Sequence, residues 1–229
     1  MSKKIVSAKQ LIRKLEMKLE EVLPLNSAQE AFFTKYDSGK SQVLSGSAGT
    51  GKTFMAFYKA FDELLNSDVE YRRIVVVRSA VSTRDIGHLP GDIEEKQAIY
   101  EAPYKGICTE LFDHAGSYDI LKENGVIEFM LTSFVRGITL DKTLVIVDEF
   151  QNCTAHELDS IVTRLGKDSK ILFAGDTVQT DFTKNNEKDA EIFMRVLGRM
   201  RNYFDFNEFK AKDIVRSELV KAYIMAKEK

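Results

Sequence analysis

A glycine-rich stretch that ends in a lysine and a threonine is the first place where this sequence can do chemistry. It occupies residues 46–53 and reads GSAGTGKT, with the spacing G-x-x-x-x-G-K-[ST] of a phosphate-binding loop, or P-loop. Glycines let backbone N–H groups surround phosphate oxygens, Lys52 can reach the β- and γ-phosphates, and the Thr53 hydroxyl can bind Mg²⁺. A hydrophobic strand before it and a helical pattern after it favour this interpretation over a glycine-rich turn without a ligand. The residues expected to bind the nucleotide are Gly46, Ser47, Ala48, Gly49, Thr50, Gly51, Lys52 and Thr53.

Two neighbouring acids, Asp148 and Glu149, form the second set of reactive side chains. They follow the hydrophobic run TLVIV at residues 143–147, and a hydrophobic strand that ends in Asp-Glu is the Walker B pattern. We expect Asp148 to hold Mg²⁺ together with Thr53, and Glu149 to polarise the attacking water as the catalytic base. Two acids at a strand end are common, but an upstream P-loop favours the catalytic interpretation. The expected cofactors are ATP and Mg²⁺.

Gln29 has two interpretations, and the residues alone leave both open. Asn26 followed three positions later by a glutamine is typical of a capping box at the start of a helix. A glutamine amide can instead pair with the N6 donor and the N7 acceptor of adenine, and a position shortly before the P-loop strand suits that role.

Three further polar side chains are expected near strand ends, where an open α/β sheet binds its ligands. Arg78 follows the strand pattern RRIVVV, Arg136 follows a strand candidate at residues 126–131, and Gln179 follows the pattern KILFA. Gln179 can orient the attacking water, as a glutamine does in other P-loop enzymes, or it belongs to an ordinary loop with an Asp-capped turn. A strand-end arginine is often merely solvated.

Arg216 is the last candidate along the chain. We expect a helix that opens at Asp213 and includes Arg216. The packed face of that helix is expected to carry Val215, Leu219 and Tyr223. Early in such a helix, Arg216 can point at a nucleotide in its own subunit or in the next one, whereas a structural salt bridge is the more common role.

The elements that position these residues fit one α/β domain with additions. The chain has 229 residues, of which 44% are hydrophobic, enough for an ordinary packed core. The net charge of −2 excludes a global attraction to nucleic acid, so such binding needs a local patch. Cys108 and Cys153 make neither a disulfide framework nor a zinc cluster, which agrees with a reducing compartment. Without a signal peptide or an apolar run of the ~18 residues that a membrane span needs, the expected location is the cytoplasm, away from the membrane.

Residues 1–23 are expected to form a basic amphipathic helix, followed by an ATP-binding domain at residues 24–229. Lysines and arginines decorate this first segment, which can pack on the domain or on a neighbouring subunit. Contact with an acidic partner or nucleic acid is the less common role of such a charged face. The apolar positions at helical spacing are Ala8, Ile12, Leu15, Leu19 and Val22.

Together, these motifs resemble the PhoH-like family of P-loop ATPases, which is widespread in bacteria and their phages. The resemblance covers most of residues 25–220, and its distinctive pieces are LPGDIEEK at residues 89–96 and the block from VDEFQNCT at residue 147 to TRLG at residue 163. Besides the P-loop, the other matching pieces are LNSAQ at residues 25–29, RSA at 78–80, FVRGITL at 134–140, GDTVQTD at 175–181 and IVRSELV at 214–220.

The family is similar to the first ATP-binding domain of superfamily-one helicases. This resemblance implies an α/β fold of the three-layer RecA-like P-loop NTPase type, with a mostly parallel central sheet and a strand between the P-loop strand and the Walker B strand. Phe150 and Ser79 depart from the small residue and the proline that are usual in the family, which makes nucleic-acid contacts near Ser79 less secure. The roles implied for site residues are Gln29 on adenine, Glu149 as the base, Gln179 in the sensor motif and Arg216 in a C-terminal arginine motif.

The leading hypothesis is an ATPase that hydrolyses ATP with Mg²⁺ and couples hydrolysis to single-stranded RNA or DNA, through Arg78, Ser79 and Arg136. An alternative is a nucleotide-dependent binding module or switch with slow turnover. A kinase is disfavoured, because a Glu beside the Walker B Asp suits water activation. If Arg216 acts across a subunit boundary, the chain must assemble head-to-tail, which predicts a homo-oligomer and, by analogy with related RecA-like ATPases, a hexameric ring. The expected catalytic residues are Lys52, Glu149, Gln179 and Arg216.

Overall fold

The computed structural model describes residues 7–80, 93–176 and 184–227. Gln179 and the LPGD part of the LPGDIEEK motif, residues 89–92, lie outside these ranges. In the part of the chain that is described, no helix combines the length and the apolar character that a membrane span needs.

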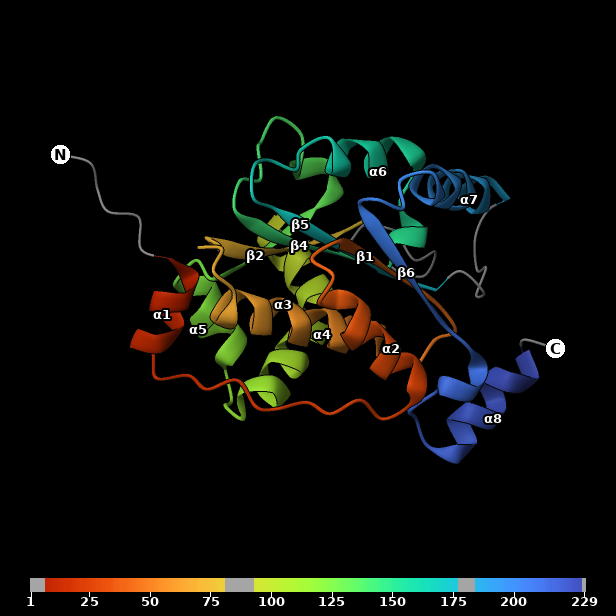
Figure 1. Ribbon diagram of the computed structural model, residues 1–229, viewed down its shortest axis with the longest axis horizontal. Coiled ribbons are helices and arrows are strands. Elements are labelled where there is room, and N and C mark those ends of the chain that lie inside the picture. Colours follow the sequence, from red (N-terminus) through yellow and green to blue (C-terminus); the bar gives the residue numbers. More distant parts are fainter. Residues whose placement is uncertain (1–6, 81–92, 177–183, 228–229) are drawn as a thin grey trace.

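A single six-stranded sheet forms the centre of the fold (Figure 1). The strand order is β3-β2-β4-β5-β1-β6, and every pairing between these strands is parallel. The P-loop strand β1 and the Walker B strand β4 lie on either side of β5, as the family resemblance implied. The strands are β1 Ser41–Gly46, β2 Arg73–Arg78, β3 Ile127–Leu131, β4 Thr143–Asp148, β5 Lys170–Gly175 and β6 Phe204–Phe209.

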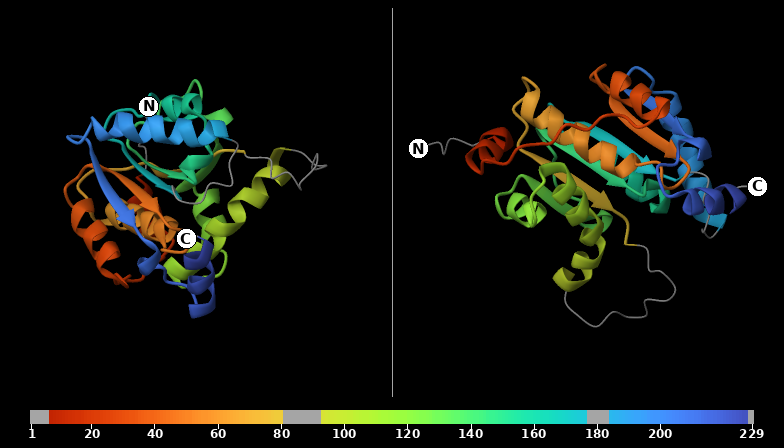
Figure 2. Two further views of the ribbon diagram at one scale, coloured as in Figure 1. Left: turned by 90° about the vertical axis from the view of Figure 1, so that its right-hand side faces the viewer. Right: turned by 90° about the horizontal axis from the view of Figure 1, so that it is seen from below.

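Helices cover both faces of the sheet, which confirms the predicted three-layer α/β architecture. In Figure 1, α6 and α7 lie above the sheet and α1 to α5 lie below it, and Figure 2 shows the same layers from two other sides. The helices are α1 Ala8–Lys14, α2 Ser27–Tyr36, α3 Lys52–Asn66, α4 Ile93–Phe112, α5 Ser117–Glu123, α6 Ala155–Val162, α7 Lys184–Gly198 and α8 Glu218–Lys227. Short 3₁₀ turns occur at η1 Thr132–Phe134, η2 Phe150–Asn152 and η3 Ala211–Asp213.

The central strands have a core on each side, which explains their hydrophobic composition. In β4, all six residues are buried; Leu144 and Ile146 face one hydrophobic cluster, and Val145 and Val147 face the other. Side chains alternate between the two faces of a strand, so a strand that is covered on both faces needs apolar residues at consecutive positions. The run TLVIV meets this requirement, and it fixes the position of Asp148 and Glu149 at the carboxyl end of β4.

The first helix is much shorter than predicted. A capping box of Ser7 and Gln10 starts α1, but the helix ends at Lys14. Glu16 has a left-handed backbone (φ 55°), its N–H bonds to the carbonyl of Arg13, and the next N–H bonds to the carbonyl of Ile12. These two bonds form a Schellman motif, which stops a helix. The prediction of a helix that continues to residue 23 is therefore wrong.

The segment after α1 nevertheless packs against the domain. Leu19 and Val22, which the helical spacing had placed on a helix face, are partly buried against the core but lie outside any helix or strand. The N–H of Glu20 donates to the carbonyl of Leu111 at the end of α4, over 2.8 Å. Contacts to α4 thus replace the intrahelical hydrogen bonds that the sequence pattern predicted.

The C-terminal helix also begins later than predicted. Asp213 closes η3, where its carboxylate accepts a 2.9 Å hydrogen bond from the N–H of Lys210, and α8 begins only at Glu218. Arg216 therefore precedes the helix. The expected packed face is wrong as well, because Leu219 is 81% exposed and Tyr223 is 68% exposed, whereas Ile224 is the buried side chain.

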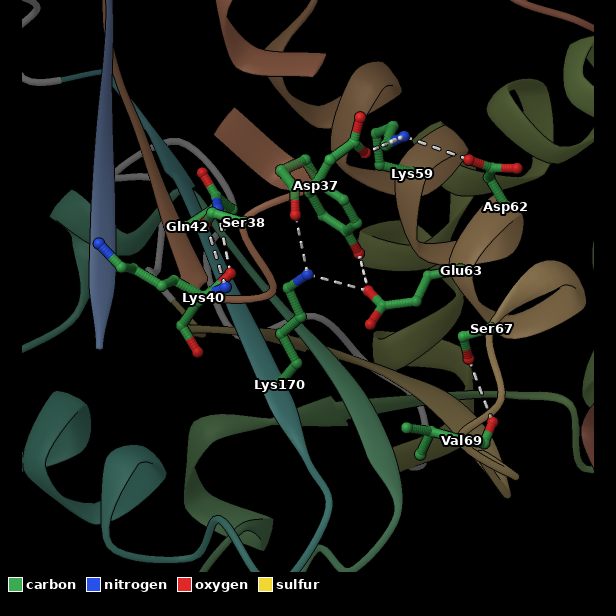
Figure 3. A network of polar contacts seen from close by, with 12 residues as sticks. Asp37, Ser38, Lys40, Gln42, Lys59, Asp62, Glu63, Ser67, Val69 and Lys170 are labelled. Atoms are coloured by element: carbon green, nitrogen blue, oxygen red, sulfur yellow. Dashed lines mark hydrogen bonds and ion pairs between the residues drawn. The ribbon is translucent and has the colours of Figure 1, made fainter. Parts of the chain in front are cut away.

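A buried ionic network fixes the amino ends of the strands, away from the P-loop. Figure 3 shows Lys170 of β5 pointing toward Glu63 of α3, and the two charges are 3.1 Å apart. Glu63 also accepts hydrogen bonds from the hydroxyls of Tyr36 and Tyr71. The Lys170 ammonium lies 3.6 Å from the centre of the Tyr36 ring. This network ties α2, α3 and β5 together.

Candidate nucleotide-binding site

The P-loop lies between β1 and α3 and is shaped by glycines. Gly46, Gly49 and Gly51 all have positive φ angles, of 124°, 73° and 85°, which most other residues adopt only with strain. Gly46 has a second constraint: a Cβ there would lie 1.8 Å from the carbonyl oxygen of Phe209 in β6. The same carbonyl accepts a hydrogen bond from the N–H of Ser47 over 2.9 Å. The edge strand thus supports one wall of the loop.

Lys52 lies inside the loop that it was predicted to serve. Its side chain is buried, and its ammonium donates to the carbonyls of Gly46 and Ser47 over 2.9 and 2.7 Å. The Thr50 hydroxyl closes the same turn by donating to the carbonyl of Ser47 over 3.0 Å. A positive charge inside a glycine loop at the start of a helix is suited to an anionic ligand such as a phosphate.

Thr53 and Asp148 come together from different elements. The Thr53 hydroxyl, in the first turn of α3, donates to Asp148 Oδ1 over 2.7 Å, and Asp148 is buried at the end of β4. A hydroxyl and a carboxylate are oxygen ligands of the kind that Mg²⁺ takes, usually with phosphate oxygens and water completing the shell. Among the described residues there is no group of three or more His, Cys, Asp or Glu side chains that could hold a metal. The Thr53 hydroxyl and the Asp148 carboxylate fit a Mg²⁺ ion that is bound together with a nucleotide.

Glu149 turns sharply out of β4. Its backbone is left-handed (φ 52°), a strained conformation for glutamate that occurs often at functional sites. Burial and the neighbouring Asp148 carboxylate raise the pKa of Glu149, although Gln151, Arg78 and Lys52 act in the opposite direction. A carboxylate with a raised pKa is a better proton acceptor near neutral pH, as a general base requires.

Gln151 belongs to this site although the sequence analysis gave it no role. Its side-chain nitrogen donates to the Glu149 carboxylate, and its oxygen accepts a 2.9 Å hydrogen bond from the N–H of Asp176 after β5. A Cβ on Gly175 would lie 2.3 Å from that oxygen, so the glycine makes room for the contact. Gln151 thus connects the predicted base to Asp176, the residue after β5. The signal in the sequence that could have identified Gln151 is its position within the VDEFQNCT motif.

Arg78 and Ser79 face inward. The guanidinium of Arg78 lies 5.9 Å from the centre of the Tyr100 ring and interacts electrostatically with Tyr104. Burial lowers the pKa of Arg78, but Tyr104, Asp148 and Glu149 raise it by more, so the charge is firmly held. Ser79 is buried, and its hydroxyl donates to Glu157 of α6 over 3.3 Å.

Arg136 has a different environment from the other two predicted nucleic-acid contacts. It lies in the turn after η1, and its side chain is exposed. Of the three residues, it is the one that a large partner can reach directly. The structure thus brings Arg78 to the acidic pair of the site, and leaves Arg136 on the surface near the end of β3.

Gln29 contacts the P-loop. Its side chain is buried; the nitrogen donates to the carbonyl of Thr50 over 3.1 Å, and the oxygen accepts from the N–H of Leu25 over 2.8 Å. Half of the predicted capping box is present, since Asn26 accepts from the N–H groups of Ala28 and Gln29. The Gln29 side chain does not complete that box, because it bonds to Leu25 and the P-loop instead.

Arg216 lies beside the P-loop of its own chain. A Cβ on Gly49 would be 3.1 Å from Cγ of Arg216 and 3.6 Å from Cγ2 of Ile214. The residue between them, Val215, donates its N–H to the carbonyl of Gly49 over 3.0 Å. The C-terminal segment therefore covers the outer side of the loop.

An all-parallel sheet with a P-loop after β1 and an Asp-Glu pair at the end of β4 defines a RecA-like P-loop nucleotide-binding domain. A family model described as PhoH-like protein matches residues 21–228. This chain belongs to the PhoH-like family, as its motifs indicated.

Two curated relatives illustrate the relationship. A PhoH-like protein of Synechocystis sp. is 35% identical over 190 residues, which are 80% of this chain and 55% of the relative. A PhoH-like protein of Bacillus subtilis is 35% identical over 187 residues, which are 80% of this chain and 57% of the relative. The chain thus spans about half the length of these relatives.

Solved structures show the same fold at low sequence identity. The large terminase from a thermophilic bacteriophage aligns with a TM-score of 0.52 and 14% identity, over 88% of this chain and 50% of that one. This likeness concerns the arrangement of sheet and helices alone.

Proposed function

We propose that this protein is an ATPase that hydrolyses ATP with the help of Mg²⁺. The observation that carries the proposal is the meeting of three side chains: the Thr53 hydroxyl lies 2.7 Å from Asp148, and Glu149 follows directly with a raised pKa. These residues together provide two ligands for a metal, Thr53 and Asp148, and a base for the attacking water, Glu149.

Each residue has a specific task in this proposal. The P-loop N–H groups and Lys52 hold the phosphates, and Thr53 and Asp148 hold Mg²⁺, which neutralises phosphate charge when bound. Glu149 accepts the proton of the water that attacks the γ-phosphorus. The contact between Gln151 and Glu149 orients the base. Gln179 is proposed to sense the γ-phosphate.

Adenine recognition is assigned to Gln29. Its amide already contacts the P-loop carbonyl of Thr50, which places it next to the nucleotide site. The amide nitrogen has a second hydrogen and the oxygen a second lone pair, and these are the groups that pair with adenine.

Single-stranded RNA or DNA is the proposed macromolecular partner, in the cytoplasm. The exposed Arg136 is its best-supported contact, because it lies near the carboxyl end of β3, at the edge of the sheet that carries the site. Arg78 and Ser79 then act from inside the protein, by connecting that edge to the acidic pair and to α6.

A homo-oligomer, in the form of a hexameric ring, is the proposed assembly. Its support is the outer side of α8 and the residues before it, where apolar side chains are exposed close to the P-loop. Apolar side chains that gather on one surface are typical of protein–protein interaction sites. Those that mark this surface are Val215, Leu219, Val220, Tyr223 and Met225.

Phosphate release is the measurement that tests the main proposal. Purified protein is given ATP and Mg²⁺, with and without single-stranded RNA or DNA, and inorganic phosphate is measured over time. Multiple turnovers support an ATPase, and faster release with one nucleic acid identifies the partner. Tight ATP binding without multiple turnovers contradicts the ATPase and supports the nucleotide-dependent switch.

A further inference from the structure

Tyr104 is a buried side chain that contacts the Walker B carboxylate. It belongs to α4, its exposed fraction is 0%, and its hydroxyl donates to Asp148 Oδ2 over 2.9 Å. Its ring is stacked on Phe57 of α3, with centroids 5.3 Å apart and planes 19° apart, and it also touches Phe129 of β3. The surrounding rings therefore fix where the hydroxyl lies.

The two oxygens of Asp148 have different partners. Oδ1 accepts from Thr53, at the start of the P-loop helix, and Oδ2 accepts from Tyr104. A carboxylate can rotate about its last bond, and a hydrogen bond to one oxygen restricts that rotation. The tyrosine thus keeps Oδ1 turned toward Thr53.

Arg78 adds a positive charge beside this pair. Its guanidinium interacts electrostatically with Tyr104 and with the Asp148 carboxylate. The hydrogen bond itself runs from the Tyr104 hydroxyl to Asp148, because an ionised carboxylate can only accept.

We propose that Tyr104 is a positioning residue of the metal site, which holds the Asp148 carboxylate in the orientation that Mg²⁺ binding requires. This inference rests on the proposed function, since it assigns a task at the same site. Groups that orient a metal ligand have large effects, and their removal commonly lowers metal affinity by about tenfold or more.

Tyr118 provides a matched control. Its side chain is 1% exposed, and its hydroxyl donates to the carboxylate of Glu101 over 3.0 Å. Glu101 pairs with Lys122 instead of with a P-loop residue. Replacement by phenylalanine therefore removes the same kind of bond from the same hydrophobic cluster without touching Asp148.

Metal affinity is the decisive readout. The Tyr104→Phe, Tyr118→Phe and unmodified proteins are saturated with ADP and titrated with Mn²⁺, which accepts the oxygen ligands of Mg²⁺ and is followed by electron paramagnetic resonance. We expect Tyr104→Phe to raise the Kd for Mn²⁺ about tenfold, with ADP affinity in EDTA unchanged. Tyr118→Phe should leave both values as they are. Equal Mn²⁺ affinity in all three proteins, or equal losses in both variants, overturns the inference.

A second measurement uses the unmodified protein and does not depend on the folding of a variant. With the ring Cζ carbons of tyrosine labelled, addition of Mg²⁺ to the ADP complex should shift the NMR signal of Tyr104 and leave that of Tyr118 in place. An unmoved Tyr104 signal contradicts the inference. The ATPase proposal is judged separately: a protein that binds Mn²⁺ and ADP but releases no phosphate from ATP refutes that proposal and leaves the Tyr104 comparison valid.

Discussion

The backbone N–H of Val215 donates a 3.0 Å hydrogen bond to the carbonyl oxygen of Gly49, the middle glycine of the P-loop. The next residue, Arg216, has its Cγ 3.1 Å from the point where a Cβ of Gly49 would be. A glycine at this position gives the C-terminal segment room to approach. The P-loop and the residues before α8 therefore form one structural unit, and a substitution in either segment should alter the conformation of the other.

Arg216 is expected to act within its own chain, because its stem packs against its own P-loop. Arg216→Ala should lower ATP turnover by about 10²-fold, the usual cost of losing one group that stabilises transition-state charge. Mixing this variant with Lys52→Ala protein should restore no activity. Arg199→Ala, which removes an exposed arginine after α7, is the matched control. Recovery of ATPase activity in the mixture would show that the arginine acts on a neighbouring subunit.

Glu149→Gln should preserve ATP binding and lower turnover by a factor on the order of 10², since it removes a general base and keeps the metal ligand. Lys52→Ala should instead weaken triphosphate binding. Turnover is measured by phosphate release, and affinity by titration with ATP in EDTA and in Mg²⁺. The exposed Glu110→Gln on α4 is the control for the charge change. A Glu149→Gln protein as active as the unmodified one would refute the assignment.

Gln29 is expected to make the protein prefer ATP over GTP. Guanine presents O6 where adenine presents an amino donor, so the paired amide geometry fails. Gln29→Ala should weaken the binding of both ATP and GTP, because the Thr50 carbonyl loses a hydrogen bond inside the P-loop. The same change should remove much of the preference for ATP. The ratio of the two kcat/KM values is the measurement. Equal turnover of GTP and ATP by the unmodified protein would contradict adenine recognition.

Lys170→Met should reduce the free energy of unfolding by up to about 3 kcal/mol, because it leaves the partly buried Glu63 carboxylate without its cation. The double variant Lys170→Met/Glu63→Gln should recover part of this loss, since no charge is then left unpaired. The exposed Lys167→Met is the control, and urea unfolding is the measurement. Equal stability of the single and double variants would mean that the ion pair is not what Lys170 contributes.

Alkaline pH is expected to destabilise the fold through buried tyrosines. Burial first, and neighbouring carboxylates second, raise the pKa of Tyr36, Tyr71, Tyr104 and Tyr118, whereas unfolded tyrosine titrates near pH ~10. A raised folded pKa means that the folded state keeps protons that the unfolded state loses. The stability from these groups is therefore complete below pH ~10 and is lost as pH rises above it, by up to about 1.4 kcal/mol per pH unit for each tyrosine.

Urea unfolding between neutral pH and pH ~11, with tyrosine ionisation followed by absorbance, checks this expectation. Tyr118→Phe should make the loss of stability with pH less steep. The buried Cys108 acts in the same direction, because burial raises its pKa to about 12. A free energy of unfolding that stays constant from neutral pH to pH ~11 would contradict the expected role of the buried tyrosines.

The features that were predicted correctly depend on residues that are close together in the sequence. Strands β2 and β4 are runs of β-branched residues because both of their faces are buried. The P-loop has its glycines because three of its positions need left-handed backbone. Local patterns of this kind need no knowledge of distant residues.

The features that were missed depend on distant contacts. Leu19 and Val22 have helical spacing, but they lie outside any helix, in a segment whose Glu20 N–H bonds to the carbonyl of Leu111. Arg216 was placed in a helix because its neighbours allow one, yet the bond from Val215 to Gly49 keeps that backbone out of it. The contact between Tyr104 and Asp148 joins α4 to the end of β4, and the spacing of residues in α4 does not predict it.

The order of strands in the sheet determines when the nucleotide site can form during translation. β1 is synthesised early, but its two partners in the sheet are β5 and β6, which begin at Lys170 and Phe204. The wall beside Gly46 is the carbonyl of Phe209. Pairing between strands so far apart in the chain forms late. A nascent chain therefore carries its GSAGTGKT stretch without a framework to hold it until β5 and β6 have been made, and gains a nucleotide pocket only when the sheet closes around β1.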